Sequence, residues 1–65
     1  MSRRSRLKLW IRQVCDGRGM SYKRALIDRA DRLGVYDTRH LTDDQLDDLF
    51  TDIVAKRYEG GADVG

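Results

Sequence analysis

The chain of 65 residues contains no proline, one cysteine and one histidine, and its apolar runs are short. The single cysteine, Cys15, excludes an internal disulfide and favours a cytoplasmic protein. The single histidine, His40, excludes the common zinc patterns, and no run approaches the roughly 18 apolar residues that span a bilayer. Charged residues interrupt the segment that follows the basic start, so we expect no signal peptide.

Motifs for catalysis and cofactor binding are also absent from the sequence. We find no nucleophile elbow, no zinc-protease helix motif and no phosphate-binding glycine loop. The glycine-rich segment 16–19 lacks the strand and the Lys-Ser/Thr ending of such a loop, and indicates a turn between helices. The aspartates of segment 43–48 diverge around a helix and do not fit a calcium loop. We therefore expect a protein that is not an enzyme and that needs no metal or cofactor.

Glycines divide the chain into three segments of helical length. Apolar residues recur at helical spacing in each segment, and no segment alternates as a strand would. We predict helices over residues 4–16, 22–33 and 43–59 in one domain, 1–60, followed by a flexible tail, 61–65. The predicted fold is a small all-α three-helix bundle, and the glycine-containing turn between its first two helices suggests a helix-turn-helix arrangement.

Polar residues at the helix starts predict how the helices begin. Ser2 or Ser5 would cap the first helix, and Ser21 the second. Thr42 and Gln45 match a capping box for the third, in which each side chain accepts from the other residue's backbone N–H. The apolar stripes predict a core of twelve side chains: Trp10, Ile11, Val14, Tyr22, Leu26, Leu33, Leu41, Leu46, Leu49, Phe50, Ile53 and Val54.

Charge is divided unevenly along the chain, although the whole carries a net +2. Residues 1–34 hold ten lysines and arginines and three acids, a net of +7. Residues 35–65 hold three lysines and arginines and eight acids, a net of −5. A local field steers a partner even where the total charge is small, and clustered cations are what phosphate binding requires. The basic half therefore predicts a surface for nucleic acid.

In this interpretation the protein regulates transcription by binding nucleic acid, DNA in preference to RNA. The N-terminal arm, the first helix, the turn and the start of the second helix would make the contacts, as they do in other small helical binders. The predicted contact residues are Arg3, Arg4, Arg6, Lys8, Arg12, Arg18, Lys23 and Arg24.

Two alternatives use the same charges differently. The acidic third helix could bind a larger protein, for example a polymerase, as an adaptor or inhibitor. The residues predicted for that contact are Asp44, Asp47, Asp48 and Asp52. Alternatively, the two halves neutralise each other within the molecule and have no further role. Four apolar residues outside the predicted core would suit a homodimer or another partner: Leu9, Ile27, Tyr36 and Tyr58.

Two segments together match the layout Y-x-x-x-L … L-T-x-x-Q-L, the first segment carrying the first part and the second segment the second. They are Met20–Ile27, which reads MSYKRALI, and Leu41–Leu46, which reads LTDDQL. Over residues 20–55 the chain resembles Mu-like phage regulators of the GemA type. The resemblance implies a small phage or prophage regulator, and it transfers no functional residue to this chain.

Overall fold

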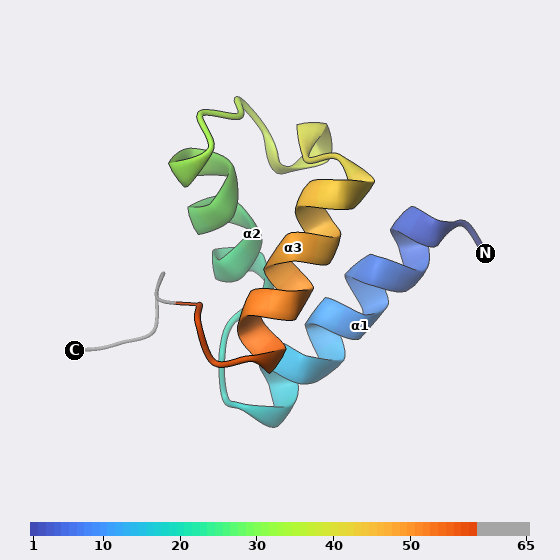
Figure 1. Ribbon diagram of the computed structural model, residues 1–65, viewed down its shortest axis with the longest axis vertical. Coiled ribbons are helices and arrows are strands. Elements are labelled where there is room, and N and C mark those ends of the chain that lie inside the picture. Colours follow the sequence, from blue (N-terminus) through green and yellow to red (C-terminus); the bar gives the residue numbers. More distant parts are fainter. Residues whose placement is uncertain (59–65) are drawn as a thin grey trace.

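A computed structural model describes residues 1–58, so the predicted tail, 61–65, lies outside the described residues. The described part contains three α-helices: α1 (Arg3–Gly17), α2 (Tyr22–Arg32) and α3 (Asp43–Val54). A short 3-10 helix, η1 (Thr38–His40), precedes α3. No strand occurs within residues 1–58. The predicted all-α three-helix bundle is confirmed (Figure 1).

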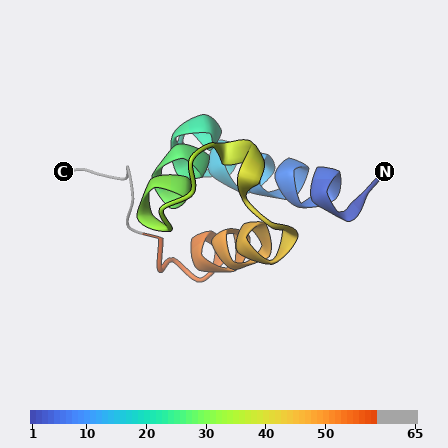
Figure 2. The ribbon, with the colours of Figure 1, turned by 90° about the horizontal axis from the view of Figure 1, so that it is seen from above.

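Helices α1 and α3 lie side by side and run in roughly the same direction, whereas α2 runs back upward in this view and crosses α1 at a steep angle (Figure 1). Arg3, at the start of α1, contacts Asp44 and Asp47 at the start of α3. Arg18, just after α1, donates to the carbonyl oxygen of Val54 at the end of α3, at 3.4 Å. Seen from above in Figure 2, α3 forms one side of the molecule, with α1, α2 and η1 on the other.

The core consists of apolar side chains from all three helices and from the segment before α3. Helix α1 buries residues four apart, Leu7, Ile11 and Cys15, which form one narrow stripe. This spacing makes Cys15 a small apolar core residue. The ten buried apolar residues are Leu7, Ile11, Cys15, Ala25, Leu26, Ala30, Leu41, Leu46, Leu49 and Ile53.

Three of the residues predicted for the core are exposed: Trp10, Leu33 and Val54 are 45%, 45% and 49% exposed. Trp10 lies at the edge of the α1 stripe, where its ring packs at 5.9 Å from the ring of Phe50. Leu33 follows α2 as its C-cap, and Val54 is the last residue of α3, so neither has a neighbouring helix over it. Three other predicted core residues, Val14, Tyr22 and Phe50, are only partly buried.

The predicted helix starts are confirmed, and Ser2 rather than Ser5 caps α1. The hydroxyl oxygen of Ser2 accepts from the backbone N–H of Ser5 at 3.1 Å. Ser21 caps α2 in the same way. In the capping box of α3, Gln45 N–H donates to Thr42 Oγ1 at 3.1 Å, and Thr42 N–H donates to Gln45 Oε1 at 2.8 Å.

The third helix is shorter than predicted, because it ends at Val54 and not near residue 59. Lys56 adopts a φ of +63°, its N–H donates to the Ile53 carbonyl, and the N–H of Arg57 donates to the Asp52 carbonyl. This is the Schellman arrangement, in which a left-handed residue satisfies the last carbonyls of a helix. After this turn, Arg57 donates to the Asp52 carboxylate and Tyr58 donates to that of Asp28 on α2.

Candidate nucleic-acid interface

The first two predicted contact arginines are bound within the molecule. Arg3 lies 3.5 Å from the Asp44 carboxylate and 3.4 Å from that of Asp47. Arg4 donates to the backbone carbonyls of Leu41 and, at 2.8 Å, of Arg39. These contacts of Arg4 fasten α1 to the segment between η1 and α3, so its guanidinium has a structural role.

Arg18 and Arg24 are also engaged, more loosely. Arg18 donates to the last carbonyl of α3. Arg24 lies 3.3 Å from the carboxylate of Asp28, one turn further along α2. Exposed pairs of this kind contribute about 0.3–0.5 kcal/mol and open readily. Both side chains therefore remain near the surface but carry a preferred partner.

The remaining four predicted cations are Arg6, Lys8, Arg12 and Lys23. Within residues 1–58, no carboxylate oxygen lies within 4.0 Å of any of them. Their side chains are exposed, apart from that of Lys8, which is half-buried. Among the predicted contact cations, those left for an outside anion therefore lie on α1 and the first turn of α2. Arg32 and Lys56, which were not predicted as contacts, also have no carboxylate oxygen within 4.0 Å in residues 1–58.

Lys8 and Lys23 line the same groove, although they come from different helices. The groove lies between α1, α2 and η1 and has a volume of about 330 Å³. Tyr22, next to Lys23, and Leu26 supply its walls. Arg12 lies one turn beyond Lys8, so both project from the same side of α1. We refer to the side chains of Lys8, Arg12, Tyr22 and Lys23 as the basic groove.

The pKa of Tyr22, which lines the groove, responds to the surrounding charges. Burial raises the pKa of the Tyr22 hydroxyl above its ordinary value, and the positive charges of Arg12 and Arg4 act against that rise. A phosphate held between Lys8 and Lys23 would lie within the same positive field.

The predicted acidic face of α3 is largely occupied by cations of the same molecule. Arg3 lies against Asp44 and Asp47, although the side chain of Asp44 is 90% exposed. Asp52 accepts from Arg29 at 2.7 Å and from Arg57 at 3.1 Å. Of the four predicted aspartates, Asp48 alone has no cation within 4.0 Å among residues 1–58.

Arg29 was missed as a site residue by the sequence analysis. Its side chain is 10% exposed, and it reaches from α2 to Asp52 on α3. The hydrogen bond from Arg29 is the main reason why the pKa of Asp52 lies below its ordinary value. The signal in the sequence is spacing: Arg29 stands four residues after Ala25 and three after Leu26, on the buried face of α2.

Of the four apolar residues proposed for a partner surface, three are exposed and one is packed against the core. Leu9, Ile27 and Tyr36 are exposed, and Tyr36 reaches 93%. Tyr58 packs against the core, and its hydroxyl donates to the Asp28 carboxylate at 3.2 Å. Burial, together with the negative charge of Asp28, raises the pKa of Tyr58 to about 12. Tyr58 therefore fastens the end of the described chain to α2.

Within residues 1–58, none of the helices has the length and apolar character needed to cross a membrane. In the same part of the chain, no three side chains of His, Cys, Asp or Glu gather as metal ligands would. Comparisons with protein-family models, with curated proteins and with solved structures found no match for this chain.

Proposed function

We propose that this chain is a non-enzymatic regulatory protein that binds nucleic acid through the basic groove. One observation carries the proposal: Lys8 and Lys23 line one groove beside Tyr22, Arg12 stands one turn beyond Lys8 on α1, and none of the three cations has a carboxylate partner within residues 1–58. Elsewhere in the described structure, most arginines already pair with aspartates. A polyanion at the groove would thus gain contacts with cations without displacing a carboxylate of residues 1–58.

The physical basis is the release of counterions from phosphates when cations of the protein replace them. Each neutralised phosphate makes log K fall by roughly 0.7–0.9 for every unit of log salt. Three contacts, from Lys8, Arg12 and Lys23, correspond to a slope of about −2 to −3. Arg24 adds a fourth contact if it leaves Asp28, and that exchange costs little because the pair is exposed.

The arrangement of α1, the turn and α2 supports the proposal as a helix-turn-helix binder. Segment 18–21 joins two helices that cross at a steep angle, and Lys23 stands exposed in the first turn of the second (Figure 1). In such binders the start of the second helix approaches the nucleic acid. Here Lys8 and Arg12 of the first helix flank that start, so both helices would contribute contacts.

The geometry favours this function over a partner surface on the acidic helix. Asp44, Asp47 and Asp52 all have arginine partners within the molecule. A basic partner would have to compete with those contacts at three of its four predicted sites. At the basic groove, no such competition arises from residues 1–58.

Fluorescence anisotropy with labelled DNA at about 50 mM salt, and then at rising salt, tests the proposal. We expect Lys23→Gln and Arg12→Gln each to weaken binding and to make the salt slope shallower by nearly one. Arg32→Gln is the matched control. Arg32 is also an exposed cation of α2, but nine residues from Lys23 it points to the opposite side of the helix. Absence of binding at 50 mM salt, or binding that ignores salt, would rule the proposal out.

A further inference from the structure

The basic groove has an apolar lining that phosphate binding does not require. Besides Lys8 and Lys23, the groove is walled by the ring of Tyr22 and by the aliphatic side chains of Leu26 and Ile27. A phosphate is strongly hydrated and gains nothing from an aliphatic wall. A flat group with apolar faces, joined to a phosphate, would use both parts of the groove.

An unpaired nucleobase has this combination of properties. Its faces are apolar, its edge carries hydrogen-bonding groups, and phosphates flank it on both sides. Thr38 also lines the groove, and a threonine hydroxyl can act as donor and acceptor toward that edge. In a duplex, the faces of a base are covered by its neighbours, so only an unpaired or extruded base can enter a groove of this kind.

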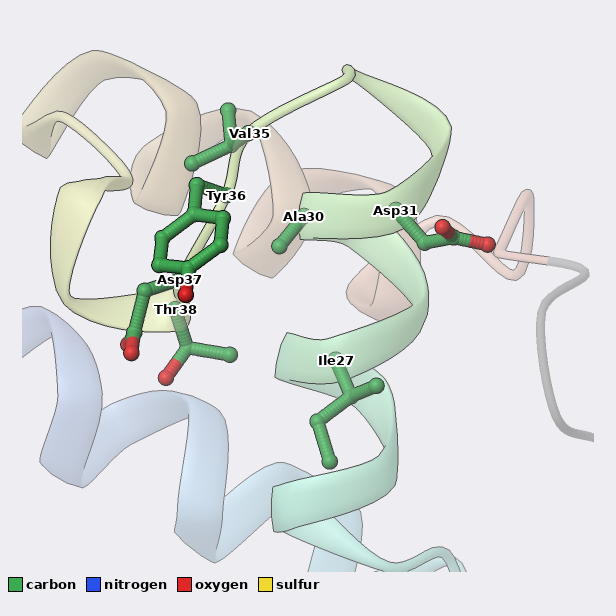
Figure 3. Close-up of a pocket in the computed structure, with 7 residues that line it drawn as sticks. All are labelled: Ile27, Ala30, Asp31, Val35, Tyr36, Asp37 and Thr38. Carbon is green, nitrogen blue, oxygen red and sulfur yellow. The ribbon is translucent and has the colours of Figure 1, made fainter.

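A second pocket continues from this groove along α2. Its volume is about 360 Å³, and it shares Ile27 and Thr38 with the first. Figure 3 shows it between the side of α2 that carries Ile27 and Ala30 and the segment 35–38. Tyr36 adds an aromatic ring that is 93% exposed. Asp31 points away from the other lining residues in Figure 3. Asp37 also lines the pocket, and its carboxylate lies 3.3 Å from the guanidinium of Arg39, which offsets its charge.

We infer that the two adjoining pockets form a track for single-stranded nucleic acid, with one unpaired base against Tyr22 and Ile27 and the next on Tyr36. Lys8, Arg12 and Lys23 hold the phosphate beside the first base. The occupant follows from charge complementarity at one end of the track and from exposed aromatic surface at the other. This inference rests on the proposed function and narrows its ligand to unpaired strands.

The experiment compares a labelled single strand of about 20 nucleotides with its own duplex by anisotropy at about 50 mM salt. We expect the single strand to bind at least about tenfold more tightly than the duplex. Tyr36→Ala should weaken single-strand binding about tenfold, the loss of one base–aromatic stack, without changing the salt slope. Ile27→Ala should have a smaller effect in the same direction, and duplex affinity should not change in either variant.

Leu9→Ala is the matched control, because Leu9 is exposed to a similar degree as Ile27 but lies outside both pockets. Polyglutamate, a polyanion without bases, should bind more weakly than the single strand. Equal affinity for strand and duplex, or for strand and polyglutamate, overturns the inference and leaves binding by charge intact. A single strand that binds Tyr36→Ala as tightly as the unmodified protein overturns it too. Failure of every nucleic acid to bind removes the proposed function as well.

Discussion

At the scale of single residues, Arg29 shows that the position of a cation in the fold decides whether its charge is available to an outside ligand. It belongs to the basic half of the sequence, yet its guanidinium is buried between α2 and α3 and bound to Asp52. A buried guanidinium without its carboxylate would keep its desolvation cost and lose its compensation. The pair therefore fixes how α2 and α3 face each other, and it adds nothing to the charge seen from outside.

Replacing Arg29 with methionine should lower the free energy of unfolding by about 2 kcal/mol, the usual contribution of a hydrogen bond to a charged group. Asp52 keeps Arg57 as a partner, which limits the loss. Urea unfolding at neutral pH measures the change. Arg57→Gln is the control: its side chain is 62% exposed, so we expect a loss below about 1 kcal/mol. Equal losses in the two variants would contradict the structural role given to Arg29.

Acid should remove the contribution of Asp52 progressively. Its pKa in the folded protein lies below the ordinary 3.8, so the stabilisation is present above that value and is lost as the pH falls through the folded pKa. The stability difference between the unmodified protein and Asp52→Asn should therefore shrink between about pH 5 and about pH 2. The pKa of Asp37 is also lowered, by hydrogen bonds from Arg39. Asp37 is present in both proteins, so its contribution to the pH dependence cancels in the stability difference. A difference that stays constant with pH would refute this account.

At the scale of the helices, local sequence decides the starts better than the ends. Ser21 and the Thr42–Gln45 box act through groups within three residues, and both form as predicted. Gly34 follows α2 with a φ of +72°, a left-handed conformation that glycine adopts without strain. The end of α3 could not be predicted in this way, because Lys56 carries no preference for the left-handed conformation that it adopts.

Lys56→Gly should therefore raise the free energy of unfolding by about 1 kcal/mol, since glycine adopts a positive φ without the strain of a Cβ atom. Thermal or urea unfolding measures the gain. Gly34→Ala provides the opposite test: a Cβ at Gly34 meets no atom within 4 Å, so its expected loss of about 1 kcal/mol comes from the backbone alone. A destabilised Lys56→Gly variant would show that the lysine side chain makes a contribution that outweighs the strain.

At the scale of the whole molecule, packing sorts the basic half into bound and available cations. The parallel arrangement of α1 and α3 brings Arg3 against Asp44 and Asp47. Lys8 lines the groove together with Lys23 of α2, and Arg12 follows Lys8 one turn along α1. Of the interpretations open to the sequence, internal neutralisation therefore holds for one part of the basic half, and the other part supports the nucleic-acid proposal.

Arg3→Gln should consequently weaken nucleic-acid binding less than Lys23→Gln does, although both changes remove one positive charge. Arg3 would have to leave two carboxylates before it could bind a phosphate, whereas Lys23 has none to leave within residues 1–58. We expect a change of less than about twofold for Arg3→Gln and at least about threefold for Lys23→Gln at about 100 mM salt. Parallel anisotropy titrations give the comparison. Equal losses of affinity in the two variants would show that each positive charge contributes to binding regardless of its position in the fold.

The sequence by itself determined the three helices, the residues that cap them, the left-handed glycine after α2 and the opposed charge of the two halves. Each of these follows from groups within about four residues of one another or from a simple count of charge. The tertiary structure alone decided which arginines are available, where α3 ends and which apolar residues stay exposed. Those outcomes depend on contacts such as Arg3 with Asp44, Arg29 with Asp52 and Tyr58 with Asp28, whose partners are far apart in the chain. Helical periodicity places a side chain on a face, but only the packing of another helix decides what that face meets.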